Sequence, residues 1–209
     1  MNRILFFFCL LFGLYSCHTP STTKTPPANI VSEFRITSTQ VGAIRKGMTI
    51  KELYAALPED RIKKLKTRTE LSNETADYYY IYGDSSRLLL IVNTERQNDE
   101  RSRISRIIVK DKRFQTASGI GLASTVGTIR TAYPHSQFLP SVDEIILYVP
   151  EIDANFEINK RLLPPSLAID STGEIAPDSI PAQTKVTDLS IFWDYSIKNL
   201  ADKTFWKDL

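Results

Sequence analysis

Residues that carry common catalytic chemistry are scarce in this chain of 209 residues. It contains two cysteines and two histidines. The sequence has no HExxH motif and no cysteine–histidine cluster with zinc-ligand spacing. A serine–histidine–carboxylate triad needs a third group that orients the histidine, and no such group is indicated near His18 or His135. We therefore expect no metal site and no cofactor.

The chain has no large excess of positive or negative charge. Lysine and arginine total 26 and aspartate and glutamate total 24, which gives a net charge of +2. A nucleic-acid-binding domain usually carries a strong basic excess. The balance therefore predicts no nucleic-acid partner.

The longest apolar run, residues 4–14, has only eleven residues. A helix that crosses a bilayer needs about 20. The run follows Asn2 and Arg3, and a short basic segment before a short apolar one is typical of a secretion signal. We interpret residues 1–16 as a signal peptide.

The end of this signal has a recognisable pattern, Leu14-Tyr15-Ser16-Cys17. It resembles the lipobox of bacterial lipoproteins, and its Ser-Cys ending is similar to those of Bacteroidota. The resemblance implies that Cys17 is acylated and becomes the mature N-terminus, with an ordinary cleavage near Ser16 as the alternative. Because Cys9 would be removed with the signal, Cys17 would have no intramolecular disulfide partner.

Residues 17–30 are rich in Thr, Ser and Pro without an apolar pattern, which predicts a flexible tether behind the anchor. By resemblance to lipoprotein sorting, His18 after the cysteine favours the outer membrane. In Bacteroidota lipoproteins, an acidic run behind the cysteine marks export to the cell surface. No such run follows Cys17, so this resemblance implies that the protein faces the periplasm. Acyl chains on Cys17 would make the membrane its first partner.

Two segments, 44–58 and 120–134, align without a gap. In the first, Thr49 and Glu52 form a predicted capping box ahead of an apolar helical stripe. In the second, Thr125 takes the capping position. The sequence therefore predicts an α+β protein made of two tandem repeats, each a helix packed on an antiparallel β-sheet. The first covers 31–113 and the second 114–209, with an inserted loop at 163–185.

Alternating apolar residues predict the strands, and matching the two copies assigns their faces. The predicted core residues are Tyr80, Tyr82, Ile107, Val109, Phe156, Ile158, Leu189 and Ile191. The predicted open face then carries Tyr79, Ile81, Arg106, Ile108 and Phe192. Aromatic residues beside arginine are favoured at the centres of protein interfaces.

The residues that begin each copy support a family resemblance. They are Ile44, Gly47-Met48-Thr49, Ile50 and Leu53 in the first, and Ile120 and Ser124-Thr125-Val126 in the second. The pattern resembles the group that contains the secreted beta-lactamase inhibitor protein and the small lipoprotein of the outer-membrane assembly machinery. This chain lacks the inhibitor's disulfides. The resemblance implies a binding surface on the open sheet face.

We therefore expect a non-catalytic envelope module that binds a protein or a glycan through this face, and the sequence leaves its oligomeric state open. One alternative is a glycan hydrolase with a carboxylate pair such as Glu151 and Asp153. Another is a protein inhibitor or assembly factor. Ser171 and Ser179 lie in short motifs that resemble O-glycosylation sites of Bacteroidota, with an unmodified loop as the alternative.

Overall fold

A computed structural model describes most of the chain after the predicted tether. The described residues are 33–68, 75–84, 86–139, 141, 143–167, 175–176 and 179–193. The signal peptide, Cys17, the tether, Ser171 and the C-terminal tail lie outside them. Within these ranges, no helix is both long enough and apolar enough to span a membrane.

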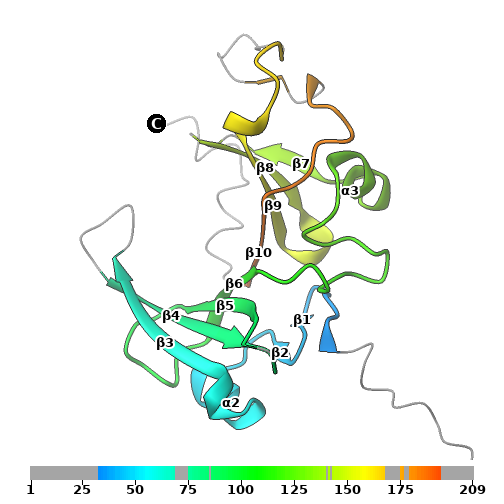
Figure 1. Cartoon of the computed structure of the whole chain (residues 1–209). Coiled ribbons are helices and arrows are strands. Elements are labelled where there is room, and N and C mark those ends of the chain that lie inside the picture. Colours follow the sequence, from blue (N-terminus) through cyan, green and yellow to red (C-terminus); the bar gives the residue numbers. More distant parts are fainter. Residues whose placement is uncertain are drawn as a thin grey trace, which may run out of the picture.

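One eight-stranded antiparallel sheet dominates the fold (Figure 1). Its strands are β3 (Ile62–Arg68), β4 (Thr75–Tyr82), β5 (Leu88–Thr94), β6 (Ile104–Val109), β7 (Gln137–Leu139), β8 (Glu144–Val149), β9 (Ala154–Asn159) and β10 (Asp188–Phe192). Their spatial order is β3-β4-β5-β6-β10-β9-β8-β7. The last strands of the two halves of the chain, β6 and β10, therefore pair at the centre of the sheet.

The remaining elements are short. A two-stranded sheet contains β1 (Gln40–Val41) and β2 (Ile44–Arg45). The helices are α2 (Ile50–Ala56) and α3 (Val126–Ala132). Three single 3₁₀ turns follow strands or α2: η1 (Glu59–Arg61), η2 (Pro150–Ile152) and η3 (Lys160–Leu162).

Both predicted helix starts are confirmed. Thr49 Oγ1 accepts from the backbone N–H of Glu52, and the Glu52 carboxylate accepts from the backbone N–H of Thr49 at 2.8 Å. At α3 the same reciprocal bonds join Thr125 and Thr128. Each pair satisfies two backbone donors that a helix start leaves without partners.

The predicted fold class is wrong. The chain is mostly β, and it does not form two repeats that each pack a helix on a sheet of their own. Pairing of β6 with β10 gives one continuous sheet, and the two-stranded sheet of β1 and β2 stands apart from it. An unpaired β6 or β10 would leave a row of backbone N–H and C=O groups open at an edge, and pairing satisfies them.

A single hydrophobic core covers one face of the sheet. Along β6 and β10 it includes Ile107 and Leu189, both fully buried. Both helices lie on this face, because Tyr54 of α2 meets the Tyr79 ring edge-on at 6.4 Å and Arg130 of α3 lies over the Phe138 ring at 5.6 Å. We call the other face of the eight-stranded sheet the open face.

The predicted assignment of side chains to the two faces is correct for β6, β9 and β10 and wrong for β4. The prediction is confirmed for the buried residues Ile107, Val109, Phe156, Ile158, Leu189 and Ile191. Tyr79 and Ile81, predicted on the open face, are instead 2% and 3% exposed in the core. Tyr80 and Tyr82, predicted in the core, are half-buried on the opposite side of the strand.

The reason is a mismatch of strands. β4 is the second strand after α2, whereas β9, with which the equal spacing aligned it, is the third after α3. The alternation of β4 was therefore read from a strand that is not its counterpart. An odd offset between two strands turns every side chain to the other face.

The corrected face of β4 leads to a stability prediction. Tyr79→Ala should lower the free energy of unfolding by about 3–5 kcal/mol, because it empties a core position. Tyr80→Ala, on the half-buried side of the same strand, should cost at least about 2 kcal/mol less. Chemical denaturation of both variants measures the difference. Equal losses would contradict the face assignment.

Candidate functional site

The open face brings together three of the five predicted binding residues. Register pairs Arg106 of β6 with Phe192 of β10, and Ile108 with Ser190. Ile108 and Phe192 are half-buried, and the Arg106 side chain is 36% exposed. Sequence reasoning therefore placed these three correctly, whereas Tyr79 and Ile81 lie in the core and cannot take part.

Arg106 contacts three neighbouring side chains on this surface. Its Nη2 donates to Ser190 Oγ at 3.0 Å and lies 3.7 Å from Glu157 Oε1. Its guanidinium carbon lies 5.0 Å from the centroid of the Phe192 ring. Such a cation–π contact contributes about 0.5–1 kcal/mol at an exposed site. The arginine is therefore held in place while part of it stays accessible.

Glu157 of β9 has an unusual electrostatic environment. Its pKa is raised to about 7, first because burial penalises the charged form and then because of the negative charge of Glu144. A side-chain hydrogen bond with Glu144 and the charge of Asp188 act in the same direction, and Arg106 opposes them. Glu157 therefore exchanges its proton near neutral pH.

Neighbouring groups complete the polar part of this surface. Ser190 is only 1% exposed, and its Oγ lies 3.4 Å from Glu157 Oε1. Lys110 Nζ contacts Asp188 Oδ1 at 2.5 Å. We call Arg106, Ser190, Phe192, Glu157 and Glu144 the central cluster. Sequence reasoning missed Glu157, because its environment comes from strands that are distant in sequence.

Some polar atoms beside the central cluster are not satisfied by the fold. Asn93 lies directly opposite Arg106 across β5 and β6. Asn93 Oδ1 and Arg106 Nε are buried and have no hydrogen-bond partner. A buried polar group in this condition costs about 1–3 kcal/mol. These two buried atoms therefore impose an uncompensated polar cost at the centre of the open face.

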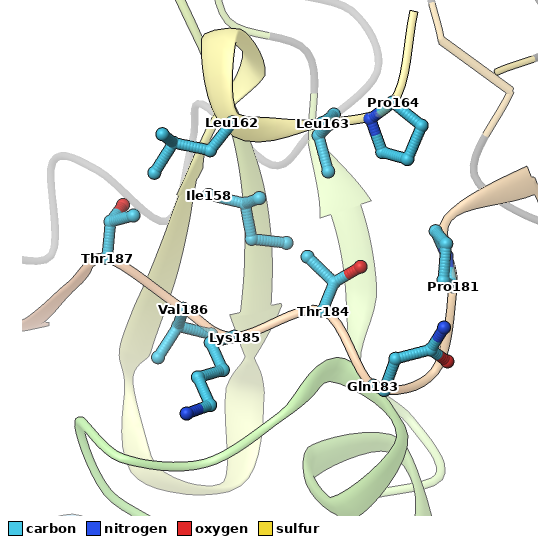
Figure 2. Close-up of a pocket in the computed structure, with 10 residues that line it drawn as sticks. All are labelled: Ile158, Leu162, Leu163, Pro164, Pro181, Gln183, Thr184, Lys185, Val186 and Thr187. Carbon is cyan, nitrogen blue, oxygen red and sulfur yellow. The ribbon is translucent and has the colours of Figure 1, made fainter. Parts of the chain in front are cut away.

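A concave region lies at the end of β9, apart from the central cluster (Figure 2). It is a groove of about 330 Å³ between η3 and residues 181–187, with Ile158 between the two walls. The lining residues are Ile158, Leu162, Leu163, Pro164, Pro181, Gln183, Thr184, Lys185, Val186 and Thr187. We call it the η3 groove. Most of this region lies in the predicted inserted loop 163–185, although the apolar residues Leu162 to Pro165 could have indicated a groove.

The carboxylates of the hydrolase alternative are engaged in other contacts. Asp153 is 6% exposed, and its carboxylate meets Lys46 Nζ at 3.2 Å and the Tyr148 hydroxyl at 3.4 Å. Glu151 Oε1 lies 3.1 Å from His135 Nδ1. These contacts tie Asp153 to the segment after β2 and place Glu151 at the surface.

Of the predicted modification sites, the structure describes only Ser179. Ser179 Oγ donates to the Ala176 carbonyl at 2.7 Å, whereas Ser171 and Cys17 lie outside the described residues. In the described ranges, no group of three or more His, Cys, Asp or Glu side chains could hold a metal ion.

Comparison with known proteins identifies a similar fold and no family. No family profile and no curated protein matches the sequence. The fold is similar to the crystal structure of the uncharacterized protein YfeY from Escherichia coli, with a TM-score of 0.50 and 13% identity. The similarity covers 76% of this chain and 99% of that chain. At this identity the likeness concerns the fold alone.

The raised pKa of Glu157 predicts a pH-dependent stability. Between pH 4.5, its ordinary pKa, and about pH 7, the folded chain holds a proton that the unfolded chain has released. The free energy of unfolding should therefore fall as pH rises through this window, by about 1–3 kcal/mol. Denaturation of the wild type and Glu157→Gln at pH 5 and pH 8 measures this change.

Glu157→Gln should remove most of this decrease, because the amide does not titrate. Glu151→Gln serves as the matched control, since Glu151 lies outside the central cluster, and it should keep the decrease. A wild type whose stability is constant or rises between pH 5 and pH 8, with Glu157→Gln identical to it, would contradict the assignment.

Proposed function

We propose that this chain is a lipid-anchored, non-catalytic binding module of the outer membrane that faces the periplasm. Its open face engages an envelope protein, and the membrane contact is made through acylated Cys17. The Leu14-Tyr15-Ser16-Cys17 pattern after a short apolar run supports the anchor. The absence of a matching family leaves the partner's identity to experiment.

One observation carries the proposed binding role. At the centre of the sheet, Arg106 stacks on Phe192 next to half-buried Ile108, on the face opposite α2 and α3. Aromatic and arginine side chains are enriched among the residues that dominate binding energy. The contacts of Arg106 with Ser190 and Glu157 hold it in one orientation, which reduces the entropy lost on binding.

The chemistry of this face favours a protein as the partner. Tyr78 and Tyr80 on β4 are half-buried on the same side as the central cluster and extend its aromatic area. Tyr80 lies opposite Ile91, and Tyr78 lies opposite Asn93, so apolar and polar positions alternate across the face. A mixed surface of this kind is typical of non-obligate protein interfaces.

Site-specific photo-crosslinking in intact cells tests this proposal. A photoreactive amino acid at Ile108 and, separately, at Tyr80 should capture the same protein. A photoreactive residue at Lys51, an exposed position on α2, should not capture it. Arg106→Glu should lower the affinity of the purified partner by roughly 10- to 100-fold, as expected for a hot-spot arginine.

Circular dichroism of Arg106→Glu checks that the fold survives. A partner that the Lys51 position captures as efficiently, or an affinity that Arg106→Glu leaves unchanged, would contradict the open-face assignment. Capture of a protease-resistant glycan at Ile108 and Tyr80 would contradict the protein class of the partner.

A further inference from the structure

The strongest unexplained surface feature is Leu162. It is 72% exposed, the one large apolar side chain with such exposure in the part of the chain that the structure describes. The turn that carries it is fixed by the fold. Asn159 Oδ1 accepts from the backbone N–H of Arg161 at 2.9 Å, and the Lys160 carbonyl accepts from that of Leu163 at 3.1 Å. The hydrogen bonds of η3 therefore hold Leu162 at the surface.

The η3 groove beside Leu162 has a fixed second wall. The backbone N–H of Gly127 donates to the Ala182 carbonyl at 2.7 Å, and that of Thr187 donates to the Glu157 carbonyl at 2.7 Å. A Cβ at Gly127 would come within 2.9 Å of Ala182 Cβ and of its carbonyl oxygen, so glycine allows this close approach. Both walls are held by the fold, and the groove is therefore preformed.

Two cations lie at this corner: Arg161 precedes the exposed leucine in the chain, and Lys185 lies on the opposite wall of the groove with its side chain directed away from Leu162 (Figure 2). Arg161 and Lys185 are exposed, and neither forms an ion pair with a residue in the described ranges. An exposed apolar side chain with cations at the same corner matches a membrane surface, where lipid phosphates meet the cations and the apolar group enters below them.

We propose that the η3 corner, defined as Arg161, Leu162, Lys185 and the η3 groove, docks on an anionic phospholipid surface. Leu162 enters the boundary between headgroups and acyl chains. Arg161 and Lys185 contact lipid phosphates. The charge of the corner favours this partner over an apolar peptide, which would gain little from the two cations.

The η3 corner and the open face are separate surfaces. Ile158, between the walls of the groove, is 1% exposed and lies two residues from Phe156 on the core side of β9. Side chains two residues apart in a strand share a face. The groove therefore belongs to the helix side of the sheet, and membrane contact there leaves the central cluster accessible. The inference does not depend on the proposed binding role.

Vesicle sedimentation of the unacylated chain tests the proposal. The protein is expressed from residue 17 onward with Cys17→Ser, so that no acyl anchor contributes. It should sediment with vesicles of phosphatidylethanolamine and phosphatidylglycerol, and much less with pure phosphatidylcholine. Leu162→Ser should weaken the partition by roughly tenfold, because the apolar side chain no longer enters the membrane. Lys185→Glu should weaken it by at least about fivefold.

Lys51→Glu is the matched charge control, since it changes net charge equally at an exposed position on α2. It should bind vesicles like the wild type, and so should Arg106→Glu on the open face. An environment-sensitive fluorophore on Leu162→Cys, in the Cys17→Ser background, should shift to the blue on anionic vesicles.

Four results would each overturn the proposal. The first is the absence of sedimentation with anionic vesicles. The second is Leu162→Ser binding as well as the wild type, and the third is Lys51→Glu losing as much affinity as Lys185→Glu. The fourth is a fluorophore at position 162 that does not respond to bound vesicles. Arg106→Glu separates the two surfaces, because it should weaken partner binding and leave vesicle binding unchanged.

Discussion

The pairing of β6 with β10 is the constraint on which the rest of the structure depends. Four residue pairs, from Leu189 with Val109 to Phe192 with Arg106, join the two halves of the chain. On one side this pairing makes the core continuous, with Ile107 and Ile191 facing each other at full burial. On the other side it places Arg106 against Phe192. The central cluster thus depends on both halves.

The same pairing explains the electrostatics of the open face. Through β10, Arg106 comes near Glu157 of β9, but the closest approach is 3.7 Å and the carboxylate also faces Glu144 and Asp188. Burial of a charge is costly unless paired and hydrogen-bonded groups compensate for it. One arginine at that distance does not compensate for two acidic neighbours, so Glu157 keeps its proton up to about pH 7.

The sequence predicted what is local and missed what is long-range. The capping box of Thr49 with Glu52 involves residues three apart, and Thr125 takes the same capping position in the second copy, so both helix starts are visible in the sequence, whereas the box partner Thr128 was not predicted. Matching the two copies also assigned the faces of β6, β9 and β10 as the structure has them. The face of Tyr79 was assigned wrongly, because the equal spacing matched β4, the second strand after α2, with β9, the third strand after α3.

The sequence pattern also could not predict that the strands of the two halves form one continuous sheet. Internal similarity indicates that two segments are alike, but it does not indicate whether their last strands pair. Nor do Arg106 and Ser190, 84 positions apart, show any local sign of their hydrogen bond. Three predicted binding residues, Arg106, Ile108 and Phe192, lie on the predicted face because the alternation of β6 and β10 was assigned correctly. Glu157 was missed because its pKa depends on neighbours from three strands.

The two proposed binding surfaces lie on opposite sides of one sheet. The Lys46–Asp153 ion pair, which joins residues 107 positions apart, adds a second tie between the halves and helps to hold η2 and the start of β9 in place. β9 in turn carries Glu157 toward the open face and Ile158 toward the η3 groove. Consecutive residues of one strand thus serve the two sides, and a rigid β9 fixes their relative orientation. A membrane contact at the η3 corner would accordingly set the direction in which the open face is presented.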